Sequence, residues 1–501
     1  MTKEELYYLP ASELLKYIQA EKDRLVKEKA IKKSKQLPVI TDEEKPYDLP
    51  KGWEWVRLGE IIDYKNGFAF SKKHMNEDGE GIPVLKSQNI MTKKVVISKK
   101  TDRVSNLSDK MKGHFVYKND LLMVLSSQSS NVEPLGITAI YELDSPSLLN
   151  QRVLKMSSIV VNTKYLYYAL NSPDFHYLLS HKASGSAQAN LKLDHVLEMA
   201  LPLPPLYIQD QIVQKLEKLS ETRDSLLVNS ESQFNYTKKM REALLQEAIR
   251  GELVTQNEND EPASILLDKI KTEKDRLVKG GIIKKTKVLP QITAEEIPYE
   301  LPFGWEWVRL GEVITLSDNL NIQSNLNPED RINYLDIDSI DNSNQTIKGV
   351  KIEPVKNLST RARRVLKKDM IVYSMVRPYL KNMAIITEDK ENYIGSTGFI
   401  AFNSIFVKKE YIFNFLRSDY TTNILNSYIT GFNSPSINMD QFNELLFPLP
   451  PLAEQERIIA KLDELLANCD QLEAKAEDMK NYTTRLFEAS LKEAFMPEEM
   501  C

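Results

Sequence analysis

Cysteine is scarce in this sequence of 501 residues. Cys469 and Cys501 are too few for a disulfide framework or for a zinc site built from thiolates. Five histidines are present, and none has the HxxxH or HExxH spacing of a zinc site on a helix. No apolar run approaches the roughly 20 residues of a transmembrane helix, and residues 1–15 lack the apolar core of a secretory signal. These absences predict a soluble, cytoplasmic protein that holds no metal.

An excess of positive charge is also absent. Lys and Arg number 66 and Asp and Glu 71, which gives a formal net charge of −5. A uniformly basic surface is therefore excluded. A local basic face is compatible with this total, because binding depends on how the charge is distributed.

The sequence motifs of several enzyme classes are missing too. There is no GxGxxG or Walker phosphate-binding loop. Residues 171–174 and 433–436 begin with asparagine, but they lack the second proline and the aromatic residue with which adenine methyltransferases hold a flipped base. Residues 388–390 (Glu-Asp-Lys) lack the preceding Pro-Asp pair of a nuclease site, so we expect a solvated turn there. The chain is therefore predicted to be non-catalytic.

The sequence does contain an internal duplication, and we call its repeated parts the frame. EKDRLVK occupies residues 21–27 and again 273–279, and GWEWVRLGE occupies 52–60 and again 304–312, in both cases 252 positions later. All four tryptophans lie in the two copies of GWEWVRLGE. The chain thus has two copies of one frame.

Each frame copy encloses an insert that ends at PLPPL. This motif occupies residues 202–206 and, 246 positions later, 448–452, so the second insert is six residues shorter. The inserts share little sequence, since FAFSKK at 68–73 stands where LNIQSN stands at 320–325. Near-identical frames around dissimilar inserts predict one framework that carries two different specificities.

A long helix is expected after each PLPPL motif. No proline or glycine interrupts residues 208–250, and a helix of that length would extend roughly 65 Å. The apolar spacing predicts a coiled-coil seam. Its a positions are Ile458, Leu465, Leu472, Met479 and Leu486 in the second copy and Ile212, Leu219, Leu226 and Met240 in the first. Its d positions are Leu462, Cys469 and Ala476 in the second copy, and Arg223, Ser230 and Gln233 make the first seam more polar. We expect the two helices to pack antiparallel; the alternative is that each packs on a separate core.

The inserts are predicted to contain both strands and helices. Short apolar runs at residues 121–125, 137–141, 370–373 and 383–387 are typical of strands, and aromatic runs at 164–170 and 409–416 are typical of helices. Amphipathic helices are expected over 12–26 and 264–278, each followed by a lysine-rich loop.

The predicted fold class is α+β. Two globular, mixed α/β domains are joined by two long antiparallel coiled-coil helices, with a pseudo-two-fold internal repeat. The predicted domains are a helix and basic loop over residues 1–52, an insert domain over 53–205, a long helix over 206–254, a second helix and basic loop over 255–304, a second insert domain over 305–451, and a C-terminal long helix over 452–501.

Polar side chains that can bond to base edges cluster in the expected turns of the inserts. Arg pairs with guanine, and Asn or Gln with adenine, in the major groove, whereas Lys and Ser more often bind phosphate. The candidate DNA contacts of the first insert are Lys72, Lys73, Ser87, Gln88, Asn89, Ser127, Gln128, Asn131, Gln151, Arg152, Gln188 and Asn190. Those of the second insert are Arg361, Arg363, Arg364, Arg377, Tyr379, Lys381, Asn433, Ser434 and Ser436. The alternative for each, taken singly, is an ordinary loop residue.

The repeated frame resembles that of a known family. LPxGWEWVRLGE opens each insert at residues 49–60 and 301–312, PLPPL closes it, and IQDQ at 208–211 and AEQE at 453–456 lead into the long helices. This combination is similar to the DNA-specificity subunits of type I restriction–modification systems (the HsdS family). The resemblance covers essentially the whole chain.

The resemblance implies a non-catalytic reader of double-stranded DNA. Each insert would be a target recognition domain for one half of an asymmetric bipartite site, and the long helices would set the distance between the halves. It also implies two partner methyltransferase subunits, which carry S-adenosylmethionine and methylate adenine, and motor-nuclease subunits that use ATP. The helical frames are the implied docking surfaces for the methyltransferase subunits, with Gln209 and Gln455 and the residues after them as candidates. No cofactor is expected on this chain itself.

Two alternatives share this layout. The first is a two-lobed coiled-coil adaptor that binds proteins and no DNA. The second is the specificity chain of a fused endonuclease–methyltransferase, which also recognises DNA but serves a different catalytic chain.

Overall fold

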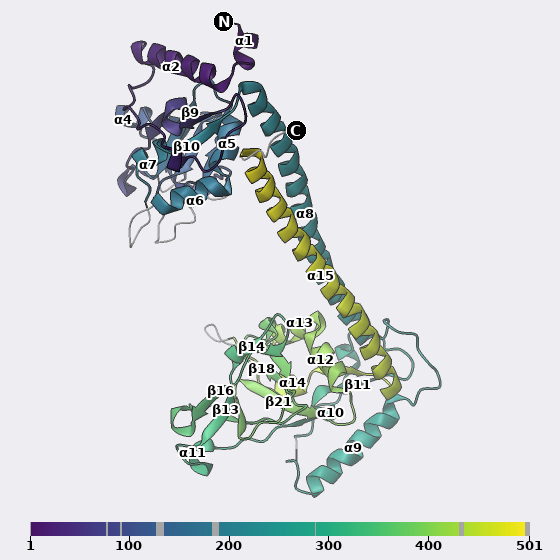
Figure 1. Cartoon of the computed structure of the whole chain (residues 1–501). Helices are drawn as coiled ribbons and strands as arrows, with labels where there is room; N and C mark the ends of the chain where they lie inside the picture. Colours follow the sequence, from purple (N-terminus) through teal and green to yellow (C-terminus); the bar gives the residue numbers. More distant parts are fainter. Residues whose placement is uncertain are drawn as a thin grey trace. The chain divides into compact units, whose positions relative to one another are not determined.

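The computed structural model describes residues 2–76, 79–90, 93–126, 135–182, 190–285, 287–429 and 435–495. Two compact units make up the chain. Unit 1 consists of Met1–Ser230 and Asp478–Cys501, and unit 2 consists of Glu231–Glu477. Each unit therefore combines one insert, the frame segments around it, and a part of each long helix (Figure 1).

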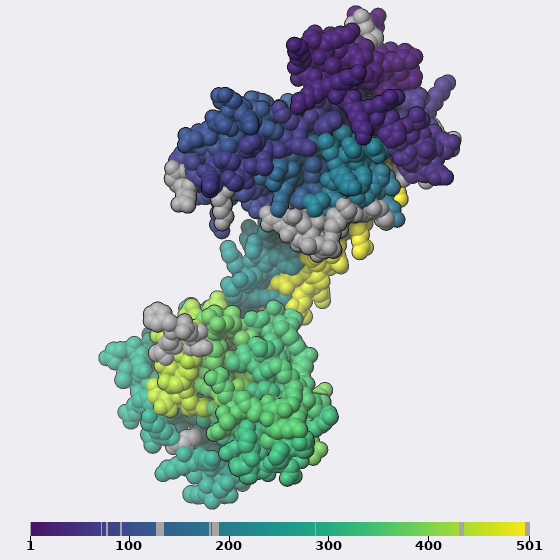
Figure 2. All heavy atoms as spheres, turned by 90° about the vertical axis from the view of Figure 1, so that its left-hand side faces the viewer, coloured from purple at the N-terminus to yellow at the C-terminus, as the bar shows by residue number. Residues whose placement is uncertain are grey.

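The frame of unit 1 begins with α1 (Lys3–Tyr7) and α2 (Ala11–Lys27). α2 buries Leu14 and Ile18 on one face, against Val56 of the frame, as the amphipathic pattern predicts. In the space-filling view this N-terminal segment, in dark purple, covers part of the insert in blue (Figure 2). α2 thus belongs to the core of unit 1.

Insert 1 starts and ends at the same pair of strands. β1 (Glu54–Arg57) pairs antiparallel with β10 (Ala200–Leu203). An antiparallel sheet of order β2-β9-β6-β7 follows, with β2 (Ile62–Asn66), β9 (Val153–Ser158), β6 (Leu121–Val124) and β7 (Thr138–Ile140). A second sheet has the order β4-β3-β8-β5, with β4 (Arg103–Val104), β3 (Ile82–Leu85), β8 (Ser147–Leu149) and β5 (Phe115–Val116). The short helices are α3 (Leu58–Ile61), α4 (Asp109–Lys112), α5 (Thr163–Leu170), α6 (Pro173–Lys182) and α7 (Leu193–Leu197).

Unit 2 repeats this arrangement. α9 (Ala263–Lys279) precedes insert 2, whose end strands β11 (Glu306–Arg309) and β22 (Leu446–Leu449) pair antiparallel. Its first sheet has the order β12-β21-β18-β19, with β12 (Ile314–Leu316), β21 (Phe399–Ser404), β18 (Ile371–Ser374) and β19 (Met383–Ile385). Its second sheet has the order β16-β13-β20-β17, with β16 (Lys351–Pro354), β13 (Arg331–Leu335), β20 (Tyr393–Ser396) and β17 (Ala362–Val365). The remaining short elements are β14 (Ile340–Asp341), β15 (Thr346–Ile347), α10 (Leu310–Val313), α11 (Ile322–Asn325), α12 (Lys409–Arg417), α13 (Asp419–Ser427) and α14 (Met439–Asn443).

The two inserts have the same sheet topology although their sequences differ. In both, the second sheet contains one parallel pair, β3 with β8 and β13 with β20. Alternate residues of the central strand face opposite sides. Leu121 and Met123 of β6 join the core beneath the frame, whereas Leu122 and Val124 join the core between the sheets. The predicted α+β class, the four predicted strands and the two predicted aromatic helices are confirmed.

A buried arginine ties the frame loop to each insert. Arg57 makes a two-pronged ion pair with Glu44, both N–O distances being 2.8 Å, and donates to Pro38 O at 3.0 Å. Arg309 pairs with the equivalent Glu296, with Nη2 donating to both carboxylate oxygens at 2.8 and 2.9 Å. Every part of these guanidinium groups thus has a partner inside the fold, which makes their burial tolerable.

The long helices are α8 (Leu206–Arg250) and α15 (Leu452–Phe495). In unit 1, the start of α8 packs on the end of α15. Leu216 and Leu491 share one core, and the Arg223 guanidinium lies 4.2 Å from the Phe487 ring centroid. In unit 2, the end of α8 packs on the start of α15, with Leu244 and Leu462 in one core. Within each unit the pairing is therefore antiparallel, as predicted. No helix in the described part of the chain has the length and apolar character needed to cross a membrane.

The predicted seam register is wrong at three of its a positions on α15, whereas the a position Ile458 is buried. Leu472, Met479 and Leu486 are 37%, 47% and 48% exposed, whereas the predicted d positions Leu462, Cys469 and Ala476 are buried. On α8 the buried column likewise follows d, through Leu216, Ser230, Thr237 and Leu244. The polar members of this column, Ser230 and Thr237, are small, and the helix backbone accepts a hydrogen bond from Thr237. The Thr237 hydroxyl donates to Phe234 O at 2.9 Å.

Candidate nucleic-acid interface

Three distant chain segments of insert 1 meet where β6 ends. Leu191 N donates to Leu125 O at 2.8 Å, and Ser126 forms a backbone bridge with Asn190. Leu125 N in turn donates to Arg152 O at 2.9 Å. Arg152 and Asn190, two of the predicted DNA contacts, therefore lie at one end of the same sheet.

Insert 2 has the same junction where β18 ends. Ile437 N donates to Met375 O at 3.0 Å, Val376 bridges Ser436, and Met375 N donates to Gly398 O at 2.8 Å. These three contacts match those of insert 1 one for one. The two inserts thus present equivalent edges.

We call the predicted contacts that gather here the polar edge of each insert. The polar edge of insert 1 consists of Gln88, Gln151, Arg152 and Asn190, and that of insert 2 consists of Arg361, Arg377, Tyr379 and Ser436. Gln88 is included because it lies three residues after Leu85, whose carbonyl accepts from Asn150 N at 3.0 Å. Arg361 is included because its carbonyl accepts from Thr397 N at 2.8 Å. Arg152 and Ser436 are half-buried and the other six are exposed.

Arg377 has an unusual backbone. Its φ of +50° lies in the left-handed region, which disfavours residues with a Cβ atom. Its N–H donates to Pro435 O at 2.8 Å, which holds it next to Ser436. A strained non-glycine residue at an exposed edge is typical of a functional position.

Other predicted contacts have their polar groups engaged within the fold. Ser87 is buried, and the buried Asn89 amide donates to Val96 O at 2.9 Å. Arg364 donates to Phe399 O at 3.1 Å and to Asn319 Oδ1 at 3.1 Å, and burial lowers the pKa of its guanidinium. The Lys381 ammonium donates to Arg417 O and Asp419 at 2.8 and 2.9 Å. The side chains of Ser87, Asn89, Arg364 and Lys381 therefore contact the rest of the insert and are not counted as part of the polar edge.

Two predicted contacts lie apart from the polar edge. Lys73 is exposed on the 3-10 helix Lys72–His74, and Arg363 is half-buried with its Nε donating to Thr360 O at 2.7 Å. The side chain of Lys72 and the residues Ser127, Gln128, Asn131, Gln188, Asn433 and Ser434 lie outside the described residues.

The structure corrects the predicted docking role of Gln209 and Gln455. Both side chains are fully buried inside their own units. Gln209 donates to Pro204 O at 2.8 Å and accepts from Asn162 N at 2.9 Å. Gln455 donates to Pro450 O at 3.0 Å and accepts from Lys408 N at 2.9 Å. These residues join the start of each long helix to its insert and offer no surface to a partner.

Thr397 lies at the junction of insert 2 and was not among the predicted DNA contacts. Thr397 precedes Gly398 and therefore occupies the place that Gln151 has before Arg152. Its residue type carries no signal, and the low similarity of the inserts hides the correspondence. Only the matched backbone hydrogen bonds reveal it.

The described residues contain no group of three or more His, Cys, Asp or Glu side chains that could hold a metal ion. Glu388 pairs with Lys390 at 2.8 Å, and the Glu388 side chain is mostly exposed, consistent with the predicted turn. His176 is half-buried, and the loss of solvent around its imidazole lowers its pKa to about 4.

Comparisons with known proteins agree with the duplicated architecture. The sequence profile of the type I restriction modification DNA specificity domain matches residues 50–233 and 302–478. The EcoAI specificity subunit of Escherichia coli is 29% identical over 96% of this chain and 88% of its own length. The EcoEI specificity subunit of Escherichia coli is 27% identical over 96% of this chain and 89% of its own length.

Solved structures share the fold. The HsdS subunit from Thermoanaerobacter tengcongensis superposes with a TM-score of 0.53 at 18% identity and covers 91% of this chain and 100% of its own. A chain from a study of the assembly and conformational transition of the type I R-M system superposes with a TM-score of 0.57 at 18% identity and covers 90% and 99%. With two profile matches that together span most of its length, the chain belongs to the family of type I restriction–modification DNA specificity subunits.

Proposed function

We propose that this chain is the DNA-reading subunit of a type I restriction–modification complex and that it recognises an asymmetric, bipartite target. Insert 1 reads one half-site and insert 2 reads the other. Two modest readers on one chain gain affinity because the second contact becomes intramolecular.

The observation that carries this proposal is the pair of equivalent polar edges. Both edges are built on the same backbone junction, but their side chains differ in kind. Insert 1 carries amides and one arginine, whereas insert 2 carries two arginines, a tyrosine and a serine. Arg pairs with guanine and Gln or Asn with adenine, so equivalent edges with different side chains fit two different half-sites.

The proposed partners supply the chemistry. Two methyltransferase subunits with S-adenosylmethionine methylate adenine within the target, and motor-nuclease subunits with ATP cleave DNA that lacks the methyl groups. This chain binds neither cofactor and acts in the cytoplasm. Its own contribution is the choice of sequence.

The test is to map adenine methylation in cells that express this chain with its methyltransferase. Two variants target the polar edges, Gln151→Ala with Arg152→Ala in insert 1 and Arg377→Ala in insert 2. We expect a bipartite motif, and each variant should relax or abolish recognition in one half only. A variant that changes both halves, or a motif without two parts, would contradict the assignment of one insert to each half.

Matched controls come from the opposite end of the same strands. Lys118 and Lys367 are exposed residues that precede β6 and β18, whereas the polar edges follow these strands. Lys118→Ala and Lys367→Ala should leave the motif unchanged. A change in motif with these controls would mean that the polar edges are not the reading surface.

A further inference from the structure

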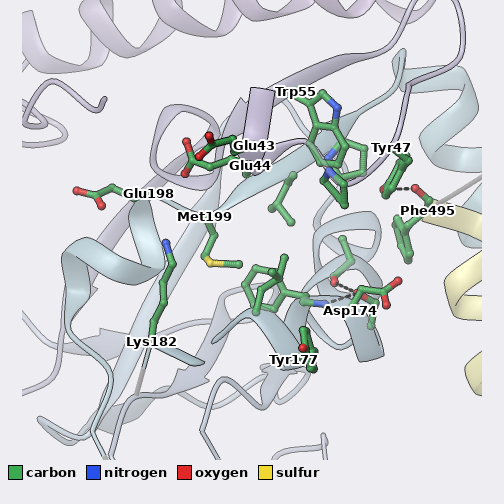
Figure 3. Close-up of a pocket in the computed structure, with 18 residues that line it drawn as sticks. Glu43, Glu44, Tyr47, Trp55, Asp174, Tyr177, Lys182, Glu198, Met199 and Phe495 are labelled. Atoms are coloured by element: carbon green, nitrogen blue, oxygen red, sulfur yellow. Dashed lines mark hydrogen bonds between the residues drawn. The ribbon is translucent and has the colours of Figure 1, made fainter. Parts of the chain in front are cut away.

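Unit 1 contains an apolar cavity of about 430 Å³ between the frame loop and the insert (Figure 3). Tyr47 and Trp55 of the frame, Phe175 and Met199 of the insert, and Phe495 of α15 line it. The Tyr47 ring lies 5.0 Å from the Trp55 ring, centroid to centroid. Aromatic and aliphatic walls of this kind suit a flat apolar group.

The internal repeat allows a residue-by-residue comparison with unit 2. The Tyr165 hydroxyl donates to Pro202 O at 2.6 Å, and the Tyr411 hydroxyl donates to Pro448 O at 3.1 Å. Seven residues later, Ser172 Oγ donates to Ala169 O at 2.8 Å and Ser418 Oγ donates to Phe415 O at 2.7 Å. These pairs are all 246 residues apart, so Ala169 corresponds to Phe415 and Asp174 to Tyr420.

In unit 2, two aromatic rings stand at the positions that border the cavity in unit 1. Tyr299 lies 5.0 Å from Trp307, as Tyr47 does from Trp55, but the Tyr420 ring packs 6.2 Å from Tyr299 and 6.2 Å from Phe415. Unit 1 has Ala169 and Asp174 at these two places. The cavity of unit 1 is therefore the space that two aromatic side chains fill in the other copy.

The rim of the cavity is acidic. The carboxylates of Glu43, Asp174 and Glu198 lie there with one ammonium, that of Lys182. The ion pairs found in the described part of unit 1 do not involve these three carboxylates, whereas Glu44 is neutralised by Arg57. A net negative rim repels DNA phosphates and attracts a cationic group beside the aromatic walls.

We propose that this cavity binds a partner polypeptide through an aromatic side chain flanked by lysine or arginine. The aromatic ring takes the place that Phe415 and Tyr420 occupy in unit 2, and the basic neighbours pair with the acidic rim. Among the described residues of the second copy, the rings of Phe415 and Tyr420 take this place, so the two halves of the chain are not equivalent to a partner. This inference goes beyond DNA reading, because it requires neither polar edge.

The test uses defined peptides and the full chain. Acetyl-Arg-Trp-Arg-amide is titrated against the protein by NMR, with acetyl-Glu-Trp-Glu-amide and acetyl-Arg-Ala-Arg-amide as comparisons. We expect the first peptide to bind about tenfold or more tightly than either comparison, since both the ring and the charge contribute. Equal binding of the three peptides would overturn the proposal.

The decisive variant is Ala169→Phe with Asp174→Tyr, which installs the residues that unit 2 already packs at these positions. It should fold, and its affinity for the first peptide should fall about tenfold or more. Lys100→Phe adds a ring at an exposed position outside the cavity and should bind as the parent does. Undiminished binding to the filled variant would refute the site.

Asp174→Asn serves as a second variant, because it removes one rim charge with little change in volume. Its affinity for the first peptide should be severalfold lower than that of the parent, and unchanged affinity would contradict the charge argument.

The methylation motif is the independent readout. It should be the same for the parent and the filled variant when the methyltransferase is present in excess, so a failure of this proposal leaves the DNA-reading assignment intact.

Discussion

Arg57 and Arg309 show how a charged residue can be part of a core. Each guanidinium lies almost fully buried, yet each meets a carboxylate and several backbone carbonyls. The two arginines occupy the same place in the repeated GWEWVRLGE sequence. Because unpaired buried charge is very costly, the carboxylates of Glu44 and Glu296 are as necessary to the frame as the arginines.

The Glu44 pair makes the stability of unit 1 depend on pH. The hydrogen bonds from Arg57 lower the pKa of the Glu44 carboxyl to about 2. A lowered pKa in the folded state stabilises the fold above the unfolded-state pKa of about 4.3, and this stabilisation is lost as the pH falls towards 2. Glu44→Gln should therefore melt at a lower temperature than the parent at pH 7, and the difference should shrink between pH 4 and pH 2. Thermal melting across this range is the measurement.

Glu43→Gln is the control for that experiment, because the neighbouring Glu43 is exposed and is absent from the ion pairs found in the described residues. Its melting temperature should follow that of the parent at every pH. A Glu44→Gln deficit that is as large at pH 2 as at pH 7 would mean that the pair with Arg57 is not its cause.

Gln209 joins helix α8 to insert 1 through two backbone groups, Pro204 O and Asn162 N. Gln209→Ala would leave both groups without this partner in a largely buried site, at a cost of about 1–3 kcal/mol for each group. We expect faster hydrogen exchange in residues 162–170 and 204–216, measured by mass spectrometry. Gln211→Ala, at an exposed position two residues later, should exchange as the parent does. Equally fast exchange in this control would mean that the effect does not come from the hydrogen bonds of Gln209.

At the scale of elements, sequence patterns predicted the parts that depend on local periodicity. Helices α2 and α9, the central strands β6 and β18, and helices α5 and α12 all carry apolar residues at the spacing of their type. The heptad spacing did not identify which positions of the long helices are buried. Leu472, Met479 and Leu486 have the right spacing and are still 37–48% exposed, because the buried column runs through the d positions, among them Leu462, Ala476 and Ser230.

The polar edges were only partly predictable, again for physical reasons. Arg152 and Arg377 are in turns whose composition suggested contact with DNA, but the sequence could not show that both end at one backbone junction. Asn89 and Arg364 have equally suitable side chains and are buried, since hydrogen bonds from distant segments engage them. Long-range pairing, which no local pattern encodes, decides which polar residues are free.

The corrected seam can be tested on helix α15 alone. Leu462 is fully buried in the core of unit 2, and Leu472 is 37% exposed. Leu462→Ala should destabilise unit 2 by about 2–5 kcal/mol, because it leaves a cavity. Leu472→Ala should cost much less, although both positions were predicted to lie in the seam. Urea unfolding measures the free energy of unfolding of both variants. Equal losses would mean that Leu472 lies in the seam, as the predicted register has it.

At the scale of the whole molecule, charge predicts how the isolated chain meets DNA. The formal net charge of −5 leaves little general attraction for phosphates. We expect weak binding that falls about tenfold or more when salt rises from about 50 to about 200 mM, since contacts with phosphate release counterions. Fluorescence anisotropy with a duplex that carries the methylated motif tests this. Tight binding that resists salt would show that the chain needs no help from partner subunits to hold DNA.

The pairing of β1 with β10, and of β11 with β22, has a consequence for how such genes can change. Each insert leaves and rejoins the frame at one hydrogen-bonded strand pair, so inserts of different length can be joined to the frame at the same two points. The coding segments for GWEWVRLGE and PLPPL lie just at these points of departure and return. A genetic crossover within either segment would therefore join a foreign insert to the frame at a strand pair that the frame already provides, and could create a new specificity in one step.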